Sequence, residues 1–257
     1  MTGGRGPASF TGTGGTYAPA RRGSKEGSGM TGGLEAELRA RYEVREERYA
    51  HGGWEASLIL PSAADELIDE GEFAFDERLP YWAELWPSAR GLTAHLLDGG
   101  RTYAGVRVLE LGCGVALPSL ALRHLGADVL ATDWYDEALR FARANASRNG
   151  LAPLQTTLLD WRHPPEDEGY GLVVAADVLY EQRNASLLAN LLPRVTAPGG
   201  TVLVADPGRV YAGEFLGMIQ DRGWRAEQVD ERVEPSAPNA HSRVRIYQLI
   251  PPAPPPA

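Results

Sequence analysis

The 257-residue sequence predicts an α/β protein built on a doubly wound, seven-stranded sheet with a small N-terminal α/β extension. Three observations support this fold class. From residue 106 onward, short apolar runs alternate with segments of helical periodicity, as in parallel strands joined by crossover helices. A glycine-containing turn at Gly112 and Gly114 follows the first of these runs. Two strand-like segments then close the chain with no helix between them, which favours an antiparallel pair.

The first hundred residues divide into a tail and an extension. Residues 1–33 are rich in Gly, Ser and Thr and cannot bury enough apolar surface to order themselves, so we expect a disordered tail. Residues 34–100 form the predicted extension, with a helix over 34–42, a strand over 54–60 and a helix over 88–97 capped by Ser88.

The predicted core covers residues 101–250, and a loose proline-rich tail follows over 251–257. Strands are expected over 106–111, 128–132, 154–159, 172–176, 201–205, 225–233 and 243–249, and helices over 118–125, 136–148, 185–195 and 213–222. The turn Pro198-Gly199-Gly200 introduces the fifth strand. Right-handed crossovers place the loops after the parallel strands along one edge of the sheet, where ligands bind in such folds.

Composition narrows the class of protein. The net charge is −9, and four basic residues lie in the first 33, so the remainder is acidic and a poor platform for nucleic acid. No apolar run is long enough to span a bilayer, and the N-terminal residues lack the apolar region of a secretory signal. A single cysteine, Cys113, excludes an internal disulfide and fits a reducing compartment. We therefore expect a cytoplasmic protein, and the near absence of lysine suggests a bacterial source.

The loop after the first core strand carries the pattern Glu110-x-Gly112-x-Gly114. Glycine lets a ligand lie against the main chain, and Asp133, 21 residues beyond Gly112, is placed to accept hydrogen bonds from a ribose. A dinucleotide fingerprint would need a third glycine where Leu117 stands, which disfavours an NAD-dependent oxidoreductase. The favoured cofactor is S-adenosylmethionine. Cys113 has no neighbouring histidine to activate it, so we do not expect a nucleophile there.

Three segments resemble the seven-strand protein-lysine methyltransferases, also called lysine methyltransferase family sixteen. They are the stretch Leu-Pro-Tyr-Trp-Ala-Glu-Leu-Trp-Pro-Ser over 79–88, the glycine motif, and Asp177-Val178-Leu179-Tyr180, within a resemblance that covers roughly residues 75–250. Asp206-Pro207-Gly208-Arg209 further resembles the branch that methylates the electron transfer flavoprotein β subunit.

The resemblance implies a Rossmann-like class I methyltransferase fold, with the extension packed on the cofactor site, and a protein substrate that presents a lysine. We further expect a monomer. The resemblance also implies that Asp177 orients the amine of the substrate lysine, that Tyr180 lines the channel through which this lysine enters, and that Arg209 contacts the substrate. The residues that it assigns to the cofactor are Trp86, Glu110, Gly112, Cys113, Gly114, Asp133, Trp134, Asp160, Trp161 and Ala176. Ala116 departs from the family, which has glycine there, and is expected to shift the cofactor's carboxylate slightly.

Alternatives remain open at this point. The acceptor could be a small-molecule amine, because the cofactor half of the site would be identical, or the protein could be a non-catalytic binder. Among single residues, Trp86 could be a core aromatic, Asp160 a helix cap and Arg209 a surface charge. His163, Glu166, Asp167 and Glu168 could be taken for metal ligands, but consecutive charges beside two prolines favour a solvated loop.

Overall fold

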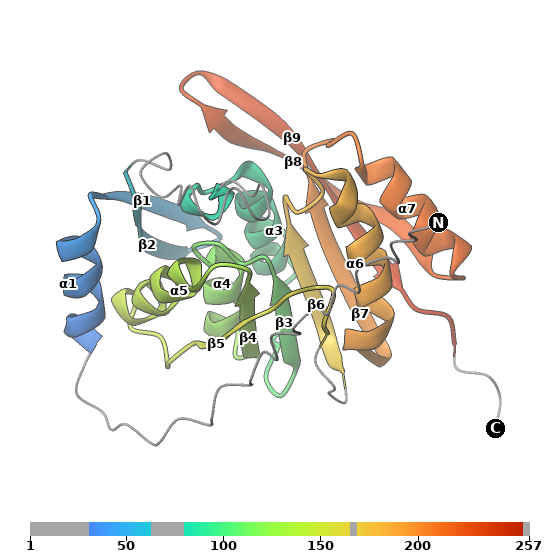
Figure 1. Cartoon of the computed structure of the whole chain (residues 1–257), viewed down its shortest axis with the longest axis horizontal. Helices are drawn as coiled ribbons and strands as arrows, with labels where there is room; N and C mark the ends of the chain where they lie inside the picture. The colour runs from blue at the N-terminus through green and yellow to red at the C-terminus, as the bar shows by residue number, and fades with distance from the viewer. Residues whose placement is uncertain (1–30, 63–79, 165–168, 254–257) are drawn as a thin grey trace, which may run out of the picture. The chain divides into compact units, whose positions relative to one another are not determined.

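The central feature is one seven-stranded sheet (Figure 1). The computed structural model describes residues 31–62, 80–164 and 169–253. In spatial order the strands of the sheet are β5 (Gln155–Leu158), β4 (Asp128–Asp133), β3 (Arg107–Leu111), β6 (Tyr170–Ala176), β7 (Thr196–Asp206), β9 (Ala240–Ile250) and β8 (Arg225–Ala237). The first five are parallel to one another, and β9 is antiparallel to both β7 and β8. The predicted seven-stranded, doubly wound sheet is confirmed.

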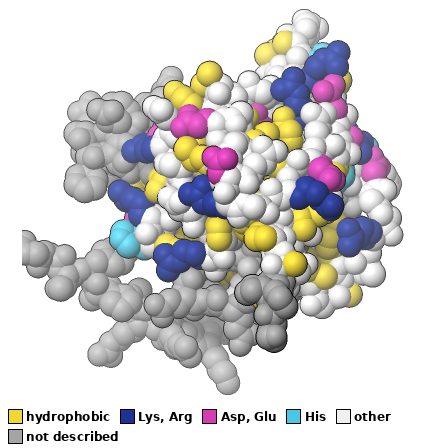
Figure 2. Space-filling model, turned by 90° about the vertical axis from the view of Figure 1, so that its right-hand side faces the viewer, with side chains coloured by type: hydrophobic (Ala, Val, Ile, Leu, Met, Phe, Trp, Pro, Cys, Tyr) yellow, Lys and Arg dark blue, Asp and Glu magenta, His cyan; other side chains and the backbone are white. Residues whose placement is uncertain are grey.

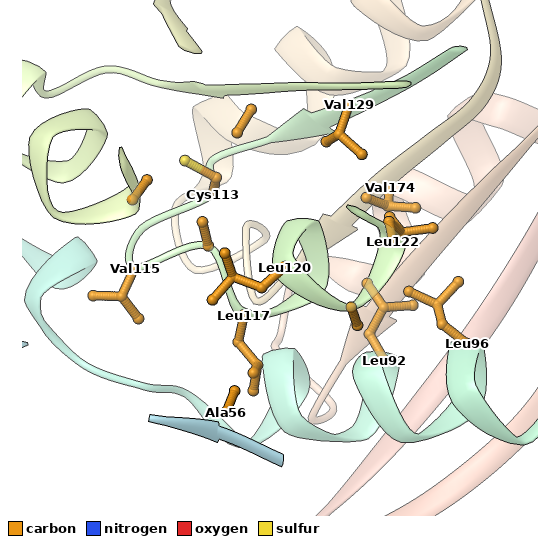
Figure 3. Close-up of a cluster of buried hydrophobic side chains, with 14 of the residues drawn as sticks. Ala56, Leu92, Leu96, Cys113, Val115, Leu117, Leu120, Leu122, Val129 and Val174 are labelled. Atoms are coloured by element: carbon orange, nitrogen blue, oxygen red, sulfur yellow. The ribbon is translucent and has the colours of Figure 1, made fainter. Parts of the chain in front are cut away.

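Helices cover both faces of the sheet (Figure 1). They are α3 (Pro87–Asp98), α4 (Leu117–His124) and α5 (Asp136–Arg148) on one face, and α6 (Gln182–Val195) and α7 (Ala212–Asp221) on the other. Alternating residues of one strand supply the two interfaces: Val174 packs with the first group of helices, and Val173 and Ala175 with the second. Figure 3 shows the first of these cores, where Leu92 and Leu96 of α3 meet Leu122 of α4 over the sheet.

The N-terminal extension consists of α1 (Thr31–Arg41) and a hairpin of β1 (Val44–His51) with β2 (Trp54–Pro61). Strand β1 was not predicted, because half of its residues are arginine or glutamate and they show no apolar alternation. Buried Asn145 of α5 joins the hairpin to the core: it accepts a hydrogen bond from the Ile59 N–H at 2.8 Å and donates to the carbonyls of Ile59 and Val115. The loop that contains the glycine motif is therefore tied to the extension.

Three local expectations need correction. The helix predicted over 34–42 begins at Thr31, so residues 31–33 do not belong to the predicted tail, whose residues 1–30 lie outside the described part. Pro198-Gly199-Gly200 lies within β7 at an irregularity of its pairing with β6, and Gly199 has a φ of +74°. Ser88 does not cap α3, because Pro87 occupies the first helical turn and Trp86 precedes it as the N-cap residue.

The described surface is mixed in character. On the side where α7 lies, shown in Figure 2, arginine and carboxylate side chains are interspersed and apolar ones form only small groups. Neither sign of charge dominates the described part of this face. None of the helices in residues 31–62, 80–164 and 169–253 has both the length and the apolar character needed to cross a bilayer.

Candidate functional site

The loops that follow β3, β4, β5 and β6 meet the segment before α3 around a cavity of about 990 Å³, measured out to open solvent. Every site residue predicted from the sequence lines the cavity except Arg209. Those that line it are Trp86, Glu110, Gly112, Cys113, Gly114, Asp133, Trp134, Asp160, Trp161, Ala176, Asp177 and Tyr180.

The glycine loop after β3 turns through left-handed backbone conformations. Gly112 has a φ of +67° and Gly114 a φ of +51°, which side chains other than glycine rarely adopt. A Cβ at Gly112 would lie 3.1 Å from a methyl group of Val178, and one at Gly114 would lie 3.2 Å from the carbonyl oxygen of Trp82. Main chain rather than side chain therefore faces the cavity at these two positions. Ala116, at the end of the loop, also has a positive φ of 67°.

Asp133 ends β4 and points its carboxylate at the glycine loop. Its Oδ2 accepts a hydrogen bond from the Gly114 N–H at 2.9 Å, and its Oδ1 accepts one from the Tyr135 N–H at 3.1 Å. Each oxygen of an ionised carboxylate can accept more than one hydrogen bond. The side chain both holds the loop and offers an acceptor at the position where the sequence predicts the ribose.

Glu110 lies at the wall of the cavity and is only 1% exposed. Its carboxylate accepts hydrogen bonds from the Ser119 N–H at 3.0 Å and from the Ser119 hydroxyl, in the first turn of α4. Burial raises the pKa of Glu110 to about 8, although the bonds from Ser119 oppose this shift. Burial therefore favours the protonated form of Glu110.

Burial also raises the pKa of the Cys113 thiol well above its usual value, so the thiol stays protonated. A protonated thiol is a poor nucleophile, which agrees with the interpretation of Cys113 as a lining residue.

Asp160 follows β5 in a tight turn rather than capping a helix. Partial burial opposes its ionisation, but hydrogen bonds from Arg162 and His163 outweigh this and lower the pKa of Asp160 to about 2. His163, considered above as a metal ligand, thus bonds to Asp160, whereas Glu166, Asp167 and Glu168 lie outside the described residues. Over the described ranges, no group of His, Cys, Asp and Glu is arranged to hold a metal ion.

The opposite end of the cavity is centred on Asp177, which follows β6 with a φ of +58°. Its side chain is 3% exposed, and its Oδ1 accepts a hydrogen bond from Nε of Arg209 at 2.8 Å. The hydroxyl of Ser88 donates to Oδ2 at 3.2 Å. Arg209, although outside the lining, therefore contacts the residue that the sequence singled out for catalysis.

Three aromatic side chains surround this end. The rings of Tyr81 and Tyr180 meet edge to face with centroids 5.0 Å apart, and Tyr81 lies 6.1 Å from Trp86. The Trp86 indole donates a hydrogen bond to the Tyr81 carbonyl at 2.8 Å. Trp86 therefore belongs to the cavity wall, whereas Trp82 is the core aromatic, packed against Phe141.

Sequence reasoning missed Tyr81, Glu84, Ser88 and Asn184 as members or neighbours of the site. Three of them lie in the 79–88 stretch that carried the resemblance, so the signal was present but not resolved to individual side chains. Glu84 is held by Arg45 of β1 at 2.5 Å, a contact that required the unpredicted strand.

The charges at the cavity have one sign. Its described lining includes no lysine, arginine or histidine but five carboxyl groups, those of Glu84, Glu110, Asp133, Asp160 and Asp177. Three of these carboxyl groups pair with arginines outside the lining: Glu84 with Arg45, Asp160 with Arg162 and Asp177 with Arg209. Such a cavity suits a cationic ligand.

Comparisons with known proteins agree with this arrangement. A family model described as lysine methyltransferase matches residues 76–222. The electron transfer flavoprotein beta subunit lysine methyltransferase of Danio rerio is 37% identical over 132 residues, 51% of each chain. The protein of that name from Xenopus laevis is 39% identical over 134 residues, 51% of this chain and 53% of the relative. The chain thus spans about half the length of the curated relatives it matches.

Among solved structures, the magnesium protoporphyrin IX methyltransferase of Synechocystis, crystallised with S-adenosylmethionine, superposes with a TM-score of 0.51. The match covers 64% of this chain and 78% of that one at 20% identity, so it concerns the fold alone. The predicted class I methyltransferase fold is confirmed.

Proposed function

Because the chain belongs to the lysine methyltransferase family, we propose that it transfers a methyl group from S-adenosylmethionine to the amine of a lysine side chain in a protein. The observation that carries this proposal is a single cavity with two unlike ends. One end offers glycine main chain and Asp133, and the other offers Asp177 among aromatic rings. A nucleoside and an amine would meet between them.

The residues present fit this cofactor. Gly112 and Gly114 keep side chains out of the cavity, and Asp133 provides the carboxylate that a ribose diol needs. The carboxyl groups of the lining match a cofactor whose sulfur is positively charged. In this proposal Glu110 and Cys113 lie beside the methionine part, Trp134, Asp160 and Trp161 beside the adenine, and Ala176 and Trp86 cover the remainder.

When bound, S-adenosylmethionine supplies a methyl group on cationic sulfur, which an amine lone pair takes while the carbon–sulfur electron pair stays on sulfur. Free lysine has a pKa of about 10.4, so at neutral pH it reaches the site mostly as an ammonium that has no lone pair to offer. Asp177 accepts a hydrogen bond from the amine and orients it. Tyr180, with Tyr81, walls the channel and excludes water, and alignment contributes much of the rate.

The names of these relatives suggest the acceptor. Both name the electron transfer flavoprotein beta subunit, and the sequence Asp206-Pro207-Gly208-Arg209 points to the same branch. A small-molecule amine is the alternative acceptor, and it would use the same cofactor half. A monomeric state, a cytoplasmic location, a bacterial source and the absence of nucleic-acid or membrane partners remain predictions from the sequence.

Two measurements test the proposal. Calorimetry on the purified chain should detect binding of S-adenosylhomocysteine and none of NAD. Tritiated methyl groups from S-adenosylmethionine should then label one lysine of one protein in a lysate of cells that lack this chain, with the site located by mass spectrometry. A chain that binds neither S-adenosylmethionine nor its demethylated product would contradict the proposal, and label in a small molecule alone would favour the alternative acceptor.

A further inference from the structure

Both carboxylate oxygens of Asp177 are engaged by the protein itself. Arg209 donates through Nε to Oδ1 at 2.8 Å, and Ser88 donates to Oδ2 at 3.2 Å. The backbone N–H of Asp177 bonds to the Ala205 carbonyl on the neighbouring strand at 2.9 Å, which fixes the position of the residue. Each oxygen retains a second lone pair with which to receive the N–H of a substrate amine.

The turn after β7 directs Arg209 at Asp177. Oδ1 of Asp206 accepts hydrogen bonds from the N–H groups of Gly208 and Arg209, both at 2.7 Å, and Gly208 adopts a φ of +94°. The Arg209 guanidinium carbon lies 5.4 Å from the ring centroid of Trp86. A planar guanidinium is suited to this combination of stacking and ion pairing. The position of Arg209 is therefore set by three independent contacts.

Asp206 is a second carboxyl group next to Arg209. It is 1% exposed, and its Oδ2 has no hydrogen-bond partner among the described residues. Burial, together with the nearby charge of Asp177, raises the pKa of Asp206, although its backbone hydrogen bonds oppose the shift. Asp206 thus bonds to the backbone of the turn, whereas the guanidinium of Arg209 pairs with Asp177.

An acidic cavity poses a chemical difficulty for methyl transfer. A carboxylate beside an amine favours the ammonium form, and an ammonium cannot attack. Besides Asp177, the carboxyl and phenol groups that line the described cavity are those of Glu84, Glu110, Asp133, Asp160, Tyr81, Tyr135 and Tyr180. None of these supplies positive charge at the transfer end.

We propose that Arg209 is a positioning residue that offsets the charge of Asp177, so that Asp177 aligns the substrate lysine as a neutral amine instead of holding it as an ammonium. This inference rests on the proposed function. The ammonium releases its proton to water before transfer, and the freed lone pair forms the new nitrogen–carbon bond. Arg209 therefore acts through Asp177 and does not touch the reacting atoms.

The first test compares Arg209→Gln, which removes the charge, with Arg209→Lys, which keeps it. Initial rates of methyl transfer to recombinant electron transfer flavoprotein β subunit are measured from about pH 6 to about pH 10, around the titration range of lysine. In Arg209→Gln the acidic limb of the kcat profile should move up by about one pH unit or more, because Asp177 then stabilises the ammonium. Its kcat should fall about tenfold near neutral pH and recover in alkali, while KM does not rise.

In Arg209→Lys the acidic limb of the kcat profile should stay at the wild-type pH. A merely structural role for Arg209 would instead reduce kcat by the same factor at every pH. If the acidic limb of Arg209→Gln stays at the wild-type pH, the inference is overturned.

A second test needs no turnover. The free energy of unfolding is measured for Arg209→Gln, Asp177→Asn and the double variant, together with binding of S-adenosylhomocysteine. The inference requires that the loss caused by Arg209→Gln largely disappear when Asp177 is already Asn, with cofactor affinity unchanged. Additive losses overturn it, whether or not the flavoprotein subunit is methylated. Failure of the wild-type chain to bind S-adenosylhomocysteine would contradict the proposed function separately.

Discussion

The two ends of the cavity are built in different ways. The end proposed for the cofactor is made largely from consecutive residues at the ends of neighbouring parallel strands, with main chain at Gly112 and Gly114 and the carboxylate of Asp133 as its main groups. The end proposed for the acceptor gathers single side chains from separate segments: Tyr81, Ser88, Asp177, Tyr180 and Arg209. A local motif therefore encodes the first end, whereas long-range packing assembles the second. A mutation at one end should therefore impair the function of that end and leave the other end intact.

The largest effect is expected at Asp177. Asparagine tolerates the left-handed backbone at this position, so Asp177→Asn removes the charge with little added strain. Loss of alignment should lower the rate of labelled methyl transfer by on the order of 10²-fold or more. Calorimetry should show unchanged affinity for S-adenosylhomocysteine, because the cofactor end is intact. Turnover at the wild-type rate would remove Asp177 from the mechanism.

The converse change is Asp133→Ala at the cofactor end. Loss of a charged acceptor costs roughly 1.5–3 kcal/mol, so affinity for S-adenosylhomocysteine should fall by about 10–100-fold. Asp133→Asn is the matched control, since it keeps one oxygen acceptor and should lose less. If calorimetry gives Asp133→Ala the wild-type affinity, the ribose assignment is wrong.

The buried Glu110 predicts a pH-dependent stability. Because burial raises its folded pKa from 4.5 to about 8, the folded state holds a proton that the unfolded state releases. The free energy of unfolding should therefore decrease as the pH rises from 4.5 to about 8. Each pKa unit corresponds to about 1.4 kcal/mol, so the total decrease is at most a few kcal/mol.

Glu110→Gln should flatten this dependence and raise stability near pH 8, as measured by urea denaturation at several pH values. A variant whose stability falls with pH as steeply as the wild type would assign the titration to another group.

The smallest effect is expected at Ala116, which occupies a left-handed conformation with a φ of 67°. Ala116→Gly should relieve a strain of about 1 kcal/mol, offset by the greater flexibility of glycine in the unfolded chain and by the loss of a buried methyl group. Ala121→Gly, equally buried within α4, is the control and should instead lower the free energy of unfolding by about 1 kcal/mol or more. Equal losses in the two variants, in parallel denaturation curves, would show that Ala116 is not strained.

The difference between local motifs and long-range packing also explains which predictions from the sequence were confirmed. The α5 helix runs over Asp136–Arg148 as predicted, and β4 ends at Asp133, one residue beyond its predicted end. Strand β1 escaped prediction because its pairing with β2, and not an apolar pattern of its own, makes it a strand. Ser88 was interpreted as a cap because capping is a local rule, whereas its contact with Asp177 crosses 89 positions of sequence.

By itself the sequence determined the seven-stranded sheet, the place of the glycine loop and the presence of Asp133 and Asp177 at strand ends, because strand and helix periodicity and left-handed turns are local properties of the chain. Only the tertiary structure decided that Arg209 pairs with Asp177, that Tyr81 and Trp86 enclose the same end, and that Glu110 is buried. These features depend on which side chains meet when the helices pack on the sheet, and on how completely this packing removes water from them. The spacing of residues along the chain contains neither kind of information.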